Sequence, residues 1–188
     1  MALDGWIGAV LVGGDPSSDG TERALVDVDG VPIGSIALDA LHGAGIERVM
    51  LVGATDAHTA ALDGEPVDDV WPGEGSAGAI LTALHHGFLS GASTVVVLAC
   101  DLPAVSSAAV ARLIDTARST SGSTEPQVVM VEEDGTARFP NGVYAMRLLP
   151  TLEARFADGA LSVSDLIAEV PVLWVDGQGA FRQHGGPG

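Results

Sequence analysis

The segment from residue 94 to residue 103, Thr-Val-Val-Val-Leu-Ala-Cys-Asp-Leu-Pro, constrains the fold more than any other part of this chain. Its first six residues are rich in valine and carry no charge, which is typical of a strand buried on both faces inside a parallel sheet. Parallel neighbours require long crossover connections, most often helices. The segment therefore predicts a central strand at 94–99 in an α/β fold, with helices on both faces of the sheet.

The rest of the chain alternates between strand-like and helix-like patterns. We expect strands at 6–12, 48–52, 67–71, 127–132, 142–146 and 172–175, and helices at 33–43, 55–62, 76–89, 106–118, 148–156 and within 158–169. Thr55 and Ser76 are the expected N-caps of two of these helices. Such alternation predicts a mostly parallel sheet with right-handed crossovers. Residues 6–176 are expected to form one domain, and residues 177–188 a frayed and flexible C-terminal tail.

Composition narrows the class of protein. The chain has 188 residues, 47% of them hydrophobic, a single cysteine at Cys100 and a net charge of −17. That charge argues against nucleic acid or an anionic membrane as a partner. Because no apolar run reaches about 18 residues, no membrane-spanning helix is expected. A lone cysteine fits a reducing cytoplasm. Solubility is the simplest reason for the acidity.

Ligands of open α/β sheets bind beyond the carboxyl ends of the strands. Three segments of this chain fall at such ends, namely 13–23, 69–78 and 100–103. Asp101 directly follows the buried strand and is held in direction by the proline two residues later. Mg²⁺ prefers carboxylates together with substrate phosphates. Asp101 is therefore a candidate magnesium ligand, and the alternative is an aspartate that only caps the next turn or helix.

The N-terminal strand pattern opens directly into Gly13 and Gly14. Glycines let backbone N–H groups approach a ligand, and successive N–H groups form a concavity that suits phosphate. A phosphate site usually also carries basic side chains, but this loop supplies three carboxylates against one cation: Asp15, Asp19, Glu22 and Arg23. The whole chain contains no lysine. A metal ion or a local nest of N–H groups would have to attract a polyphosphate here.

Together these segments resemble the molybdenum cofactor guanylyltransferases and their wider nucleotidyltransferase relatives. That family opens with Leu-Ala-Gly-Gly-x-Ser-x-Arg-Met-Gly-x-Asp-Lys-Ala-Leu, and residues 11–25 match this motif in length without a gap. The family's Leu-Ala-Cys-Asp-Leu/Met-Pro motif is matched by residues 98–103. Its Gly-x-Gly-Pro-Leu-x-Gly loop loosely resembles residues 73–78, and its Pro-x-x-Gly-x-Tyr segment is similar to residues 139–144.

The resemblance implies a three-layer Rossmann-like nucleotidyltransferase fold and a reaction. The family transfers GMP from GTP to the terminal phosphate of molybdopterin and releases pyrophosphate. For this chain it implies Mg²⁺ as cofactor, GTP or another nucleoside triphosphate as substrate, and molybdopterin or a related phosphorylated acceptor. Its catalytic residues would be Arg23 and Asp101, with Asp101 holding the metal. The implied nucleotide-binding residues are Leu11, Gly13, Gly14, Arg23, Asp69, Gly75 and Gly78.

The chain departs from the family pattern at its cations. Ser18 stands where the family has an arginine, and Arg23 stands where it has a lysine. Guanidinium is a planar fork whereas ammonium is a compact point charge, and losing a group that stabilises the transition state costs roughly 10²–10³ in rate. The family's C-terminal Phe-x-Asn-x-Asn-Thr pattern is also altered, at residues 181–186. Two classes of function stay open, a working nucleotidyltransferase and a nucleotide- or pterin-binding partner protein without turnover.

Overall fold

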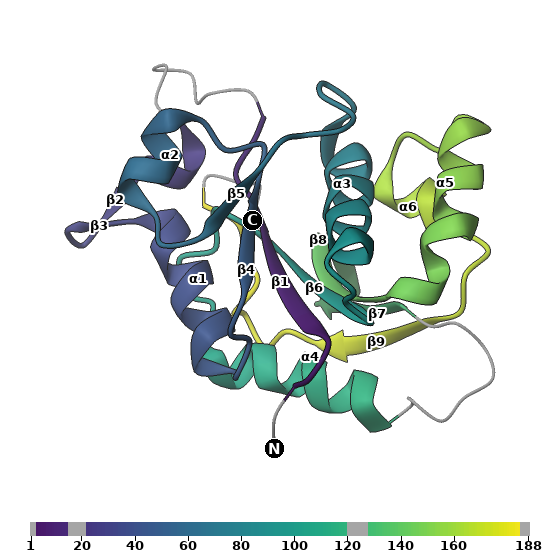
Figure 1. Ribbon diagram of the computed structural model, residues 1–188. Coiled ribbons are helices and arrows are strands. Elements are labelled where there is room, and N and C mark those ends of the chain that lie inside the picture. The colour runs from purple at the N-terminus through teal and green to yellow at the C-terminus, as the bar shows by residue number, and fades with distance from the viewer. Residues whose placement is uncertain (1–2, 15–21, 120–127, 185–188) are drawn as a thin grey trace.

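The computed structural model describes residues 3–14, 22–119 and 128–184 of the chain. A seven-stranded sheet with the order β5-β4-β1-β6-β8-β7-β9 lies between two layers of helices (Figure 1). The strands of this sheet are β1 (Trp6–Leu11), β4 (Val49–Val52), β5 (Glu65–Val67), β6 (Thr94–Ala99), β7 (Val128–Glu133), β8 (Thr136–Ala145) and β9 (Val172–Asp176). A small hairpin pairs β2 (Asp27–Val28) with β3 (Val31–Pro32).

Helices cover both faces of the sheet. The helices are α1 (Ile33–Gly43), α2 (Asp56–Ala61), α3 (Gly75–Leu89), α4 (Ser107–Ser119), α5 (Leu149–Ala157) and α6 (Val163–Leu166), with short 3₁₀ turns η1 (Arg23–Leu25) and η2 (Met146–Leu148). One hydrophobic cluster joins α1 and α4 to the sheet, and a second joins α3, α5 and α6 to the opposite face (Figure 1). Two buried layers of apolar side chains therefore hold the three layers together.

The predicted central strand is confirmed. β6 lies between β1, to which it is parallel, and β8, to which it is antiparallel. Val95, Val96, Val97 and Leu98 are all fully buried. β5, β4, β1 and β6 run parallel, as do β7 and β9, so the sheet is mostly parallel as predicted. The antiparallel strand β8 forms a hairpin with β7.

Two local predictions near α3 are wrong. The strand expected at 67–71 is the shorter β5, because the Asp69 carboxylate accepts a hydrogen bond from the Trp71 N–H and turns the chain away from the sheet. Ser76 was the expected cap, but α3 begins one residue earlier, at Gly75, and Glu74 occupies the N-cap without a side-chain bond. The predicted cap at Thr55 is confirmed, since its side chain accepts a hydrogen bond from the His58 N–H.

The C-terminal segment differs from the expected frayed tail over residues 177–184. Phe181 is 1% exposed, and its N–H donates to Oε1 of Glu133 at 3.0 Å. Glu133 is buried as well, and its Oε2 lies 3.1 Å from Nε of Arg138. An aromatic side chain buries a large apolar area. Phe181 therefore anchors residues 177–184, which their glycine-rich composition predicted to be frayed. The expected tail at 185–188 lies outside the described residues.

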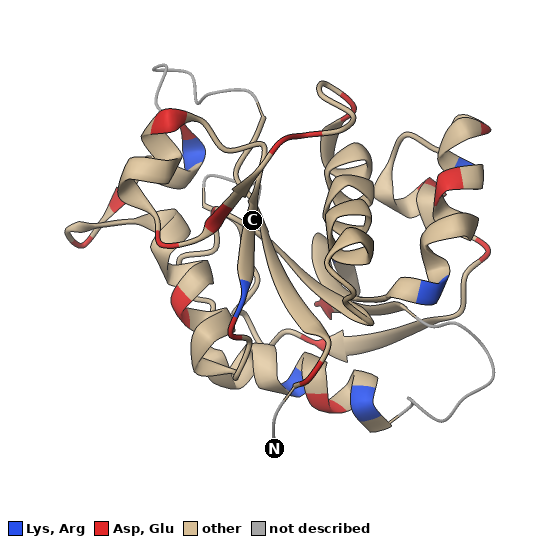
Figure 2. Cartoon of the chain, viewed as in Figure 1, with Lys and Arg blue, Asp and Glu red and all other residues tan. Residues whose placement is uncertain are grey.

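Charge is spread widely over the surface. Figure 2 shows acidic residues on helices and loops on both sides of the sheet, with far fewer basic ones. Among the described residues, no helix is both long and apolar enough to cross a membrane.

Candidate functional site

The carboxyl ends of β1, β4 and β5 meet at one edge of the sheet. Gly13 follows β1, and its N–H donates to the carbonyl of Val52 at 3.0 Å. A Cβ at Gly13 would lie only 3.2 Å from Cα of Gly53, and a Cβ at Gly53 would lie 4.0 Å from Cβ of Asp69. The backbone therefore approaches closely here, which explains why glycine occupies both positions.

The two loop glycines play different parts at this edge. The Gly13 N–H is already bonded within the sheet. Gly14 has φ of 133° and faces open space, with nothing within 4 Å of where a Cβ would stand. Leu11 is 7% exposed, and its side chain belongs to the core under α3. A ligand over this loop would therefore meet backbone at Gly14, and Leu11 has only its backbone to offer.

Asp101 is held from three directions at the end of β6, and its side chain is 8% exposed. Nη1 of Arg23 lies 3.9 Å from its Oδ2. The side-chain amide of Gln183 donates to its Oδ1 at 3.1 Å, and the His184 N–H donates to its carbonyl at 2.8 Å. The structure thus brings together the two residues that we expected to be catalytic, and it adds two that sequence reasoning missed.

The strand end that carries Asp101 is itself well fixed. Oδ1 of the buried Asn141 accepts a hydrogen bond from the Ala99 N–H at 2.9 Å, which closes the edge of β6 beside the site. Cys100 is buried, and burial first, then the neighbouring carboxylate of Asp101, raises the pKa of its thiol to about 12. Because the thiolate is the reactive form, Cys100 is part of the core and not a nucleophile.

Asp69 organises the loop that leads into α3. Its Oδ1 accepts hydrogen bonds from Oγ1 of Thr82 at 2.7 Å and from the Trp71 N–H at 3.1 Å. Thr82 is fully buried and also accepts a bond from the Val70 N–H. Sequence reasoning missed Thr82, since a single threonine inside an apolar helix gives no signal of its own. Through these hydrogen bonds Asp69 fixes the loop between β5 and α3 to the side of α3.

The glycines of that loop fit the same role. A Cβ at Gly78 would come within 2.8 Å of Cβ of Glu74, so only glycine lets the loop pack on α3. Gly75 has φ of 60° and faces open space, like Gly14 on the other side of the edge. Open backbone at Gly14 and Gly75 and a carboxylate with a nearby cation at Asp101 suit an anionic ligand that brings its own metal ion.

A mostly parallel α/β sheet whose candidate site lies at the carboxyl ends of its strands is typical of ligand-binding α/β proteins. A family model described as MobA-like NTP transferase domain matches residues 8–171. Because this match spans most of the chain, the protein belongs to the MobA-like NTP transferase family.

Relatives in several organisms agree with this assignment. A protein of Opitutus terrae named "Probable molybdenum cofactor guanylyltransferase" is 28% identical over 161 residues, which are 86% of this chain and 77% of that protein. The crystal structure of molybdopterin-guanine dinucleotide biosynthesis protein A from Archaeoglobus fulgidus superposes with a TM-score of 0.71 at 20% identity, covering 92% and 84% of the two chains. Rv0371C of Mycobacterium tuberculosis, in complex with manganese, gives a TM-score of 0.62 at 18% identity over 91% and 88%. The two structures share the fold of this chain.

Proposed function

We propose that this protein is a magnesium-dependent nucleotidyltransferase that transfers GMP from GTP to molybdopterin and releases pyrophosphate. The observation that carries the proposal is the meeting of Arg23 and Asp101 at the carboxyl edge of β6, with Nη1 and Oδ2 3.9 Å apart. The two residues come from separate motifs, one N-terminal and one central. Family membership supports the nucleotidyl transfer, and the relatives with molybdenum cofactor names support the choice of acceptor.

The site's side chains fit a magnesium ion. No group of three His, Cys, Asp or Glu side chains that could hold a metal occurs among the described residues. Mg²⁺ commonly binds one or two protein oxygens and takes the rest from phosphates and water. The Asp101 carboxylate would supply such a ligand, and the side-chain amide of Gln183 holds it in place by donating to its Oδ1. Bound there, the ion would neutralise charge on the triphosphate.

The chemistry needs no protein nucleophile. An oxygen of the acceptor phosphate forms the new bond to the α-phosphorus, and the bond from that phosphorus to the β-phosphate bridging oxygen breaks. The electron pair leaves with pyrophosphate. Such reactions depend on positioning and on neutralising charge. The guanidinium of Arg23, 60% exposed, is free to reach a triphosphate in front of Asp101.

A second candidate is a binding protein that has lost turnover. The observation in its favour is the shortage of cations, because the family's loop arginine is Ser18 here and the chain has no lysine. Removing a group that stabilises charge in the transition state costs roughly 10²–10³ in rate. Such a protein would still bind the nucleotide through Gly14 and Asp101.

The test separates the two candidates. Thermal stability is measured with GTP, ATP and CTP, each with and without Mg²⁺, and pyrophosphate release is followed with molybdopterin as acceptor. We expect GTP with Mg²⁺ to stabilise the wild type and Asp101→Asn to abolish the effect, whereas Asp39→Asn, on the exposed face of α1, should leave it intact. Stabilisation without turnover would favour the binding protein. No shift with any nucleotide would refute the nucleotidyltransferase and a nucleotide-binding partner protein, and would leave a pterin-binding protein.

A further inference from the structure

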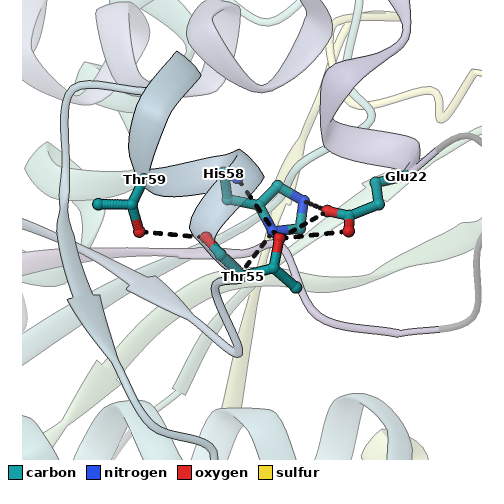
Figure 3. Close-up of polar contacts among 4 residues, drawn as sticks. All are labelled: Glu22, Thr55, His58 and Thr59. Carbon is teal, nitrogen blue, oxygen red and sulfur yellow. Dashed lines mark hydrogen bonds and ion pairs between the residues drawn. The ribbon is translucent and has the colours of Figure 1, made fainter.

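A polar cluster outside the predicted site joins the end of the glycine loop to α2. Figure 3 shows the side chains of Glu22 and His58 pointing toward one another, with Thr55 beside both. Nε2 of His58 lies 2.7 Å from Oε2 of Glu22. The Thr55 hydroxyl lies 3.1 and 3.2 Å from the two oxygens of the same carboxylate and donates to it. His58 of α2 and Thr55, the N-cap of that helix, thus hold one carboxylate of the N-terminal segment.

The hydrogen bonds fix the state of the imidazole. The backbone N–H of Thr55 donates to Nδ1 of His58 at 3.1 Å, so Nδ1 carries no proton. The proton of the neutral ring must then lie on Nε2, the nitrogen that faces Oε2 of Glu22. Protonating Nδ1 would break the reciprocal cap at the start of α2, in which the Thr55 side chain also accepts from the His58 N–H.

Burial makes this cluster rigid. The His58 side chain is 2% exposed and that of Glu22 is 31% exposed, so the imidazole is shielded from water and the carboxylate is half-buried. Burial lowers the pKa of His58, against the opposing pull of the Glu22 charge. The Thr55 hydroxyl adds a charge-assisted hydrogen bond to the Glu22 carboxylate, and such bonds are stronger than those between neutral groups. The carboxylate therefore has one well-defined place.

The cluster is joined through the backbone to Arg23, the cation of the candidate site. Glu22 is the residue before Arg23, and its carbonyl accepts a hydrogen bond from the Leu25 N–H at 2.9 Å, which starts η1. Ala24 is fully buried under α1. The backbone that carries Arg23 is therefore held on one side by Glu22 and on the other by Ala24. From there the guanidinium reaches to 3.9 Å from Asp101.

We propose that His58 and Thr55 are positioning residues for nucleoside triphosphate binding, acting through Glu22 to set the place of Arg23 in front of Asp101. This inference rests on the proposed function, since it assumes that Arg23 binds the triphosphate. It gives α2, which contributes no residue to the predicted site, a defined part in substrate affinity. It also gives a role to a half-buried carboxylate in a loop where more negative charge opposes a polyphosphate.

The experiment compares Thr55→Val with Thr55→Ser. Valine has the shape of threonine without the hydroxyl, while serine keeps the donor to Glu22 and the acceptor of the cap. We expect Thr55→Val and His58→Gln to weaken binding of Mg²⁺·GTP by about threefold to tenfold, the size of coupling within one network. Thr55→Ser should bind as the wild type does, and so should His42→Gln, whose histidine is exposed on α1. Circular dichroism identifies any variant that fails to fold.

The same substitutions in an Arg23→Ala background separate positioning from a general structural role. If His58 acts through Arg23, His58→Gln causes no further loss of affinity once Arg23 is gone. An equal loss in both backgrounds would overturn the inference, as would wild-type affinity in both Thr55→Val and His58→Gln. If the wild type itself binds no nucleoside triphosphate, the proposed function fails and takes this inference with it.

Discussion

The side-chain amide of Gln183 donates a hydrogen bond to Oδ1 of Asp101 at 3.1 Å, across 82 residues of sequence. The next residue extends the contact, because the His184 N–H donates to the carbonyl of Asp101 at 2.8 Å. A segment that follows the last strand of the sheet thus returns to the end of the central strand. The C-terminal segment is therefore a wall of the candidate site.

The first prediction concerns this wall. If the Gln183 amide positions the Asp101 carboxylate for the metal, Gln183→Ala should raise the Mg²⁺ concentration needed for GTP binding by about tenfold, the usual cost of losing a hydrogen-bond partner of a metal ligand. The measurement is a Mg²⁺ titration at fixed GTP, followed by thermal shift. Gln178→Ala is the matched control, since that side chain is exposed in the same segment. An unchanged Mg²⁺ dependence would remove Gln183 from the metal site.

The second prediction concerns the anchor of the same segment. Glu133 is 2% exposed, accepts the Phe181 N–H and faces Arg138, so Glu133→Gln leaves the partly buried guanidinium of Arg138 without its counter-charge. We expect a loss of about 1–3 kcal/mol in the free energy of unfolding. Hydrogen exchange at the Phe181 amide should also speed up. Asp134→Asn is the control, because that carboxylate is 78% exposed and such surface pairs contribute about 0–1 kcal/mol.

The centre of the sheet could be predicted from the sequence because β1, β4 and β6 are buried on both faces. β6 and β1 are continuous apolar runs, and such runs are recognised as buried strands directly from the sequence. The shortening of β5 could not be predicted in the same way. It depends on a hydrogen bond from Thr82, which lies in α3, to Asp69. A tertiary contact of that kind leaves no trace in the local pattern.

The residues of the candidate site also fall into two groups, those that a local sequence pattern reveals and those that only a tertiary contact brings into place. Asp101 and Arg23 are visible in the sequence because each stands at the end of an apolar strand or in a glycine loop. Gln183 is not, because its place depends on Phe181 entering the core two residues earlier. A lone aromatic residue in a glycine-rich end was the available signal, since large aromatic residues are seldom left in water. The role of His58 is not visible in the sequence for a similar reason, because its partner Glu22 is far away along the chain.

The third prediction concerns the cation of the site. Arg23→Ala should weaken GTP binding by about tenfold or more, because a hydrogen-bonded charge contributes about 1.5–3 kcal/mol. Its effect on stability should be small, since the side chain is 60% exposed. Arg23→Lys restores the charge and should recover part of the affinity. Isothermal titration gives the binding constants, and equal affinity in wild type and Arg23→Ala would remove Arg23 from the site.

The fourth prediction concerns the reactivity of Cys100. With its thiol pKa raised to about 12 by burial, the folded protein should not react with a thiol reagent at pH 8 on the time scale of minutes. The protein unfolded in guanidinium chloride should react at once and with one equivalent. Rapid labelling of the folded protein would show that the end of β6 opens to solvent.

The last prediction concerns pH and the cluster of Glu22, Thr55 and His58. The pKa of His58 lies below its ordinary value of 6.5, so folding favours the neutral ring. This contribution to stability is present above pH 6.5 and is lost as the pH falls through the lowered pKa. The midpoint of urea unfolding should therefore decrease below pH 6.5 in the wild type. His58→Gln should flatten that decrease, because glutamine does not titrate. His42→Gln, which changes an exposed histidine, should keep the wild-type slope, and an equally steep slope in His58→Gln would contradict the assigned state of the ring.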